Sequence, residues 1–183
     1  TIKMEVSRSS EPDIEFLKKV RQLANDKNII LIFDECTSGF RQSFGGIHLL
    51  TGVNPDIAMF GKAMGNGYAV TAVVGRREIM EAAQSSFISS TFWTERIGSV
   101  AALKSLEIME ETQSWKTITN QGNKIKKMWQ KLADTNQLNI NHWGLPSLAG
   151  FTFDSKNALE YKTLITQEML KKGFLAGNSV YVS

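Results

Sequence analysis

The sequence predicts an α/β fold with a mostly parallel sheet, followed by a smaller α+β segment. Residues 29–33 form a continuous apolar run, which is typical of a strand buried on both faces in a parallel sheet. A strand-like run at 2–6 and a helical pattern ending near Asn25 precede it. Strand, helix and strand in this order make a βαβ unit, for which we expect a right-handed crossover.

The first helix is expected to begin at the polar residues that follow the first strand. Ser9 and Ser10 are typical caps, and Pro12 is tolerated in the first turn. The helix buries an apolar face that includes Leu17 and Val20. The further elements expected in this segment are a polar turn at 37–46, a short helix at 47–51, strands at 57–60 and 70–75, and helices at 76–83 and from about 96 to 111.

A boundary is expected between about 111 and 114, which divides the chain into residues 1–112 and 113–183. The second segment is expected to contain an amphipathic helix at 115–133, strands at 138–143 and 148–153, a helix at 159–172 and a last strand at 179–183. The apolar face of the first of these helices includes Met128 and Leu132. Gly173 is a plausible C-terminal cap for the second.

Composition excludes several classes of protein. The net charge is only +3 and the basic residues are dispersed, so we expect no nucleic-acid surface. The longest apolar runs are far shorter than a membrane span. A single cysteine, Cys36, permits no internal disulfide and favours a cytoplasmic setting. Because the chain begins at Thr1 in a strand-like run, we expect it to be a piece of a longer protein.

Two charged residues mark the candidate chemistry. Asp34 follows the apolar run 29–33, where a parallel strand would deliver it to a ligand crevice. Lys62 lies 28 positions later, in a loop that follows the strand 57–60. A pyridine cofactor held as an imine needs such a lysine, and a carboxylate keeps the ring nitrogen protonated. Taken singly, Asp34 could be a turn aspartate and Lys62 a solvated lysine.

The loop around Lys62 contains Gly61, Gly65 and Gly67. Glycines let the backbone bend closely around a bound group, and burial there would desolvate the amine. The loop lacks the glycine spacing and the following Ser or Thr of a Walker P-loop, and no Gly-x-Gly-x-x-Gly follows the first βα turn. A nucleotide-binding function is therefore not favoured.

The remaining candidates have ordinary alternatives. The hydroxyls of 89–94 precede a helix and could bind a phosphate, although Thr94 could simply be the helix cap. Cys36 has no neighbouring histidine or cysteine in the sequence, so a packing role is favoured over a nucleophile. His48 and His142 are the only histidines, and they form neither a metal-binding spacing nor a catalytic triad.

Three segments together resemble class III pyridoxal-phosphate (PLP) aminotransferases. Residues 31–41, LIFDECTSGFR, resemble the Asp-Glu-Val-x-x-Gly-Phe-Arg segment of that family. Residues 54–67, NPDIAMFGKAMGNG, resemble its lysine segment, and residues 90–103 its phosphate-contacting segment. The branch that the sequence resembles most is the glutamate-1-semialdehyde 2,1-aminomutase-like group. The resemblance covers essentially the whole chain, in order.

The resemblance implies a role for each matching residue. Lys62 would be the Schiff-base lysine and the general acid/base, and Asp34 would pair with the protonated pyridine nitrogen. Cys36 stands where the family usually has valine and would pack on the cofactor ring. Thr91 would contact the cofactor phosphate, in this family across the interface of a homodimer. Glu5 receives no role, because Val6 replaces the proline of the family's Glu-Pro pair.

The resemblance also implies fold type I of the PLP-dependent transferases. Residues 1–112 would be the C-terminal part of the large PLP-binding domain, and residues 113–183 part of the small α+β domain. The family's phosphate loop and ring-stacking aromatic lie upstream, so the partial sheet would expose edges.

The expected reaction is amino transfer between a small-molecule amine and a carbonyl acceptor, or the related aminomutase reaction, with PLP as cofactor. A non-catalytic fragment or interaction module is the alternative. A racemase or decarboxylase of the same fold type would share Asp34 and Lys62, but the 39–41 turn and the Thr91 segment argue against it.

Overall fold

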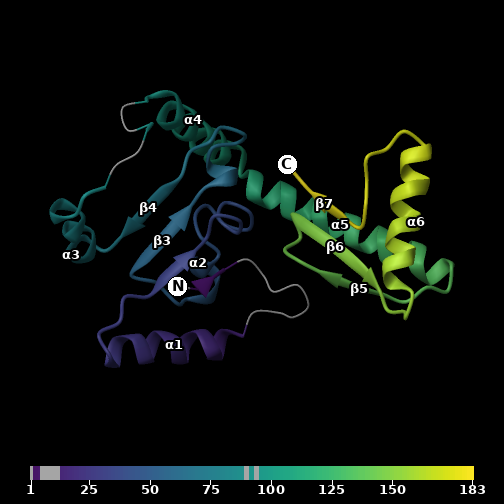
Figure 1. Ribbon diagram of the computed structural model, residues 1–183, viewed down its shortest axis with the longest axis horizontal. Coiled ribbons are helices and arrows are strands. Elements are labelled where there is room, and N and C mark those ends of the chain that lie inside the picture. The colour runs from purple at the N-terminus through teal and green to yellow at the C-terminus, as the bar shows by residue number, and fades with distance from the viewer. Residues whose placement is uncertain (1, 5–12, 89–90, 93–94) are drawn as a thin grey trace. The chain divides into compact units, whose positions relative to one another are not determined.

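The computed structural model describes residues 2–4, 13–88, 91–92 and 95–183 of the chain. They form two compact units, one containing the described residues up to Trp115 and the other Lys116 to Ser183 (Figure 1). Among the described residues, no helix combines the length and the apolar character needed to cross a membrane.

The first unit is built on a four-stranded sheet (Figure 1). Its strands, in spatial order, are β1 (Ile2–Lys3), β2 (Ile32–Asp34), β3 (Ile57–Phe60) and β4 (Ala72–Gly75). The first three are mutually parallel and β4 is antiparallel to β3. The predicted α/β class with a mostly parallel sheet is confirmed.

Strand β2 is shorter than the apolar run that predicted it. Helix α1 (Ile14–Asp26) is followed by Asn28 in the left-handed region, with φ of 53°. Ile29 and Ile30 are then exposed and belong to the connection, so burial begins only at Leu31. The apolar run therefore covers a loop end as well as a strand.

Asp13 caps α1, because its side chain accepts a hydrogen bond from the Phe16 amide at 2.9 Å. The start predicted at 9–12 is wrong, although those residues themselves lie outside the described part. Helix α4 begins after Arg96, which occupies the cap position, and Thr94, the alternative cap, lies outside the described residues. The remaining helices of this unit are α2 (His48–Thr51), the 3₁₀ turn η1 (Lys62–Met64), α3 (Arg77–Met80), the 3₁₀ turn η2 (Glu81–Ser85) and α4 (Ile97–Thr112).

A buried carboxylate joins the elements at the amino end of β3. Asp56 accepts hydrogen bonds from Arg21 at 2.9 Å, Arg76 at 3.1 Å and the Leu31 amide at 2.8 Å. Burial by itself raises the pKa of Asp56, but these bonds outweigh it and hold the pKa below its ordinary value. Asp56 therefore holds α1, β2 and β4 together at the edge of the sheet away from Lys62.

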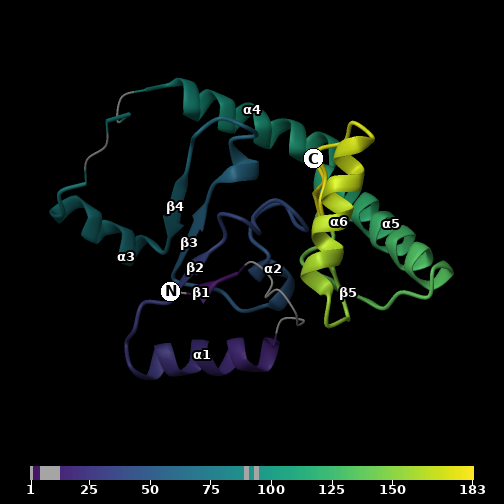
Figure 2. The ribbon, with the colours of Figure 1, turned by 45° about the vertical axis from the view of Figure 1, so that its right-hand side comes forward.

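The second unit packs helices against a three-stranded antiparallel sheet. Its elements are α5 (Ser114–Thr135), β5 (Ile140–Trp143), β6 (Leu148–Phe153), α6 (Ala158–Lys171) and β7 (Ser179–Tyr181), with spatial strand order β5-β6-β7 (Figure 1). Figure 2 shows helices α5 and α6 of this unit from a second direction. Gly173 has φ of 84° directly after the Lys172 cap, as predicted. Met128 and Leu132 are about 60% exposed, so the predicted apolar face of α5 is only partly buried.

Candidate active site

Asp34 and Lys62 lie at the same edge of the sheet. Asp34 is the last residue of β2 and pairs with Met59 of the parallel strand β3. The ladder continues one residue further, because the Glu35 amide donates to the Met59 carbonyl at 2.8 Å. Strand β3 ends at Phe60, and Gly61 leads to Lys62. Parallel strands thus deliver both charged residues from their carboxyl ends, where α/β proteins bind ligands.

The Lys62 side chain extends to the turn that follows Asp34. Its amine donates a hydrogen bond to the Thr37 hydroxyl, and Arg41 Nε donates to the Thr37 carbonyl at 3.3 Å. Lys62 is exposed in the described part of the chain, so the burial that would desolvate its amine is not present there. Its φ of 44° is unusual for a residue with a side chain, and such backbone conformations concentrate at functional sites.

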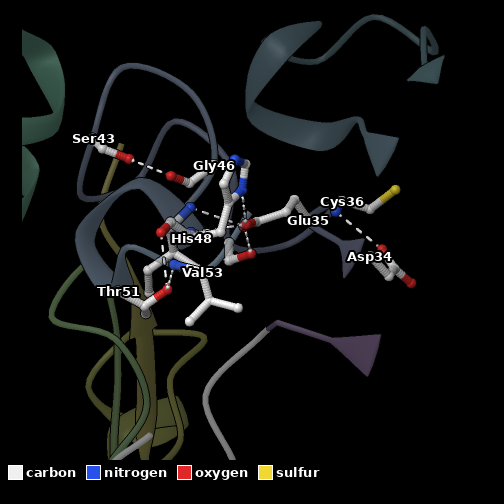
Figure 3. Close-up of polar contacts among 10 residues, drawn as sticks. Asp34, Glu35, Cys36, Ser43, Gly46, His48, Thr51 and Val53 are labelled. Atoms are coloured by element: carbon white, nitrogen blue, oxygen red, sulfur yellow. Dashed lines mark hydrogen bonds and ion pairs between the residues drawn. The ribbon is translucent and has the colours of Figure 1, made fainter. Parts of the chain in front are cut away.

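Asp34 has a carboxylate that is only partly used. Its Oδ1 accepts a hydrogen bond from the Cys36 amide at 3.0 Å (Figure 3). Among the described residues, Oδ2 has no hydrogen-bond partner. An ionised carboxylate can only accept, so this oxygen is available to a donor such as a protonated ring nitrogen.

One glycine of the Lys62 loop, Gly65, is required by a close contact. A Cβ on Gly65 would lie 2.2 Å from the Tyr68 carbonyl oxygen, which no side chain could tolerate. A Cβ on Gly61 would lie 3.3 Å from Thr71 Cγ2 and 3.7 Å from Cys36 Sγ. The half-buried Cys36 side chain therefore lies beside the backbone that carries Lys62, on the turn that also carries Asp34.

Glu35, which sequence reasoning did not single out, is fully buried. Its carboxylate accepts hydrogen bonds from the Ser38 hydroxyl, the amides of Ile47 (3.0 Å) and His48 (3.1 Å), and His48 Nδ1 (2.8 Å). Burial raises its pKa, but the bonds from His48, Ser38 and the amides together hold the pKa below its ordinary value. The sequence offered one signal for this contact, namely an acidic residue directly after an apolar strand with a histidine 13 positions later.

The predicted phosphate-contacting segment is described only in part. Thr91 is an exposed turn residue before α4, and Ser89, Ser90, Trp93 and Thr94 lie outside the described residues. The phosphate contact expected of Thr91 therefore stays a prediction. Glu5 also lies outside the described residues.

The two histidines lie in different surroundings. His48 contacts Glu35, whereas His142 Nε2 lies 3.1 Å from Gln130 Oε1 and its ring stacks on Trp129. Burial, and secondly the charge of Lys126, lower the pKa of His142. No group of three or more histidine, cysteine or acidic side chains in the described part of the chain could hold a metal ion.

Comparison with known proteins identifies a family and two similar relatives of this chain. The family model for class III aminotransferases matches residues 9–182. The chain is 41% identical over 157 residues to 3-aminobutyryl-CoA aminotransferase of Cloacimonas acidaminovorans, covering 85% of the chain and 38% of that protein. It is 32% identical over 168 residues to glutamate-1-semialdehyde 2,1-aminomutase of Legionella pneumophila strain Paris, covering 89% and 39%. The chain thus spans less than half the length of these relatives.

Two solved structures share the fold. FumI of Sphingopyxis sp. MTA144, in its PLP internal aldimine form, superposes with a TM-score of 0.89 at 21% identity, covering 98% of this chain and 44% of that one. Acetylornithine aminotransferase of Elizabethkingia anophelis gives a TM-score of 0.81 at 22% identity, covering 99% and 47%. The predicted fold, part of a fold type I PLP-dependent transferase, is confirmed.

Proposed function

The chain belongs to the class III aminotransferase family, and we propose that the protein containing it transfers amino groups with the help of PLP. The observation that supports this most directly is the arrangement at the ends of β2 and β3. The exposed amine of Lys62 donates a hydrogen bond to Thr37. Thr37 lies in the turn directly after β2, whose last residue, Asp34, has one carboxylate oxygen without a hydrogen-bond partner among the described residues. An amine and a carboxylate at one sheet edge are what a pyridine aldehyde cofactor requires.

The donor set fits this cofactor. Lys62 would attach it covalently through Nζ, and Oδ2 of Asp34 would accept a hydrogen bond from its protonated ring nitrogen. Cys36 would pack against the ring and Thr91 would contact the phosphate. When bound, PLP supplies an electron sink that makes the substrate C–H bond next to the amino group acidic.

Lys62 would also carry the proton. With its Nζ unprotonated, it removes the proton from the substrate carbon and returns it to a neighbouring carbon, which is general base and then general acid catalysis. The Thr37 hydroxyl, which accepts a hydrogen bond from Nζ, would hold the amine at the sheet edge. Asp34, as an anion, would stabilise the positive charge on the protonated ring nitrogen.

Family membership limits the substrate class. A small-molecule amine as donor and a carbonyl compound as acceptor are the proposed substrates, in a reaction that is either a transamination or an aminomutase reaction. One similar relative is named an aminotransferase and another an aminomutase. The non-catalytic alternative is not favoured, because the chain has both Asp34 and Lys62 in the segments that match the family.

We further propose that residues 1–112 belong to the large domain and residues 113–183 to the small domain of a homodimer, in which Thr91 reaches the partner's cofactor. Membership of a family of small-molecule enzymes and the single cysteine support a cytoplasmic enzyme without nucleic-acid or membrane partners.

The experiment compares absorbance after addition of PLP to the full-length enzyme and to two variants. Wild type should develop the visible band of PLP bound to a lysine, and Lys62→Ala should not. Lys104→Ala is the matched control, since Lys104 is an exposed lysine on α4 that pairs with Glu107, away from the candidate site. If Lys62→Ala develops the same band as wild type, the proposal is wrong.

A further inference from the structure

The carboxylate of Glu35 holds both ends of the turn that follows β2. Ser38, near the start of the turn, and the amides of Ile47 and His48, at its end, all donate to it. The Glu35 carbonyl also accepts the Gly39 amide at 2.8 Å. One buried residue therefore determines how the chain leaves the strand and where it returns.

His48 completes this arrangement from α2. Its Nδ1 lies 2.8 Å from Glu35 Oε1, and because an ionised carboxylate only accepts, Nδ1 must carry the proton. The ring edge packs on Phe33 of β2, with ring centroids 6.1 Å apart. A Cβ on Gly46 would lie 2.3 Å from His48 Nδ1 and 2.7 Å from Glu35 Oε1. The backbone thus encloses the pair so closely that only glycine fits at position 46.

Glu35 and Asp34 are consecutive, so their side chains leave the extended backbone on opposite sides. Figure 3 shows Glu35 directed toward His48, whereas Asp34 and Cys36 lie on the other side, joined by the Cys36 amide. Glu35 holds this turn from one side. On its other side the turn carries the Cys36 amide, which donates to Asp34, and the Thr37 hydroxyl, which accepts from Lys62. A shift of this turn would therefore move the partners of both Asp34 and Lys62.

We infer that Glu35 and His48 are positioning residues for the amino-transfer reaction, which fix the 34–38 turn so that Asp34 and Thr37 meet Lys62 and the cofactor. This inference rests on the proposed function. The alternative is that the pair only stabilises the fold, as Asp56 does at the opposite edge of the sheet. Both carboxylates are buried and accept several hydrogen bonds, which makes Asp56 a matched control.

The test uses the full-length enzyme and the variants Glu35→Gln, His48→Leu, His48→Gln and Asp56→Asn. For each, kcat, KM, the Kd for PLP and hydrogen exchange of the peptide covering 34–48 are measured. Glu35→Gln and His48→Leu should lower kcat about 10-fold or more, because small misplacements of catalytic groups have large effects. They should also weaken PLP binding and speed exchange in that peptide.

The controls separate positioning from general stability. His48→Gln keeps a side-chain donor for Glu35 and should recover most of the kcat lost in His48→Leu. If Glu35→Gln or His48→Leu does not fold, the remaining variants of the pair are compared with Asp56→Asn. Asp56→Asn should lower the melting temperature but leave kcat and exchange at 34–48 near wild type. The inference is overturned if the Glu35 and His48 variants affect kcat and PLP binding no more than Asp56→Asn at a similar loss of stability. If wild-type enzyme does not bind PLP at Lys62, the proposed function fails as well.

Discussion

The amine of Lys62 donates a hydrogen bond to the hydroxyl of Thr37, which lies 25 positions earlier in the chain. The contact joins the loop after β3 to the turn after β2, so that the lysine lies beside the strand end that carries Asp34. Sequence reasoning paired Lys62 with Asp34 through a cofactor, but the described contact is made by Thr37. Thr37 is therefore the first residue to test after Lys62 itself.

Replacing Thr37 by valine should lower kcat by about 10-fold, because the branched shape remains while the acceptor for Lys62 Nζ is lost, and misplaced groups react slowly. Steady-state kinetics checks this. Thr37→Ser should restore activity, and Thr163→Val, on the exposed face of α6, should have no effect. Wild-type kcat in Thr37→Val would show that the contact has no catalytic role.

Replacing Asp34 by asparagine should lower kcat by about 100-fold or more, while Lys62 can still attach the cofactor. Asparagine is similar in size but carries no charge, so the ring nitrogen loses the anion that stabilises its protonated form. Single-turnover kinetics together with the absorbance spectrum of the bound cofactor separates attachment from reaction. A variant that reacts at the wild-type rate would remove Asp34 from the mechanism.

Most of the strand positions could be predicted, because apolar runs and their turn residues are local signals. Strands β3 and β6 have the predicted bounds. The start of α1 was wrong because Ser9, Ser10 and Pro12 are all typical of helix starts, whereas Asp13 is the cap in the structure. Local patterns do not determine which of several suitable caps is used.

The site was predictable only where it depends on residue type and order. Asp34 and Lys62 were found because each follows an apolar strand, and parallel strands deliver their ends to one edge. Glu35 and Thr37 were missed, since their importance comes from contacts with His48 and Lys62. Such contacts depend on how a turn folds back, which hydrophobic periodicity does not report.

Acid should destabilise the first unit, because the pKa values of both Glu35 and Asp56 are lowered by folding. Their contribution to stability is fully present above the unfolded-state values of about 4.5 and 3.8, and is lost as the pH falls through the lower folded values. The free energy of unfolding should therefore fall steeply below about pH 4.5. Asp56→Asn should make this decline shallower, as measured by denaturant melts across pH. If the free energy of unfolding of Asp56→Asn declined with pH as in wild type, the lowered pKa of Asp56 would be contradicted.

Replacing Gly122 by alanine should destabilise the second unit by about 1–3 kcal/mol, the usual range for overpacking. Its Cβ would lie 1.8 Å from the Pro146 carbonyl oxygen, so the α5 helix or the 144–147 loop must move. Thermal unfolding measures the effect, and Gln121→Ala, at the exposed neighbouring position, is the control. Equal melting temperatures for the two variants would show that α5 does not approach the loop so closely.

Lys62 is the proposed attachment point of PLP, and borohydride reduction makes an imine on that lysine permanent so that it can be located. The full-length enzyme is incubated with PLP, reduced, digested, and its peptides are analysed by mass spectrometry. A pyridoxyl group is expected on the peptide containing Lys62, at close to one per chain, and should be lost in Lys62→Ala. A reduced adduct on other lysines with Lys62 unmodified, or no adduct at all, would contradict this attachment.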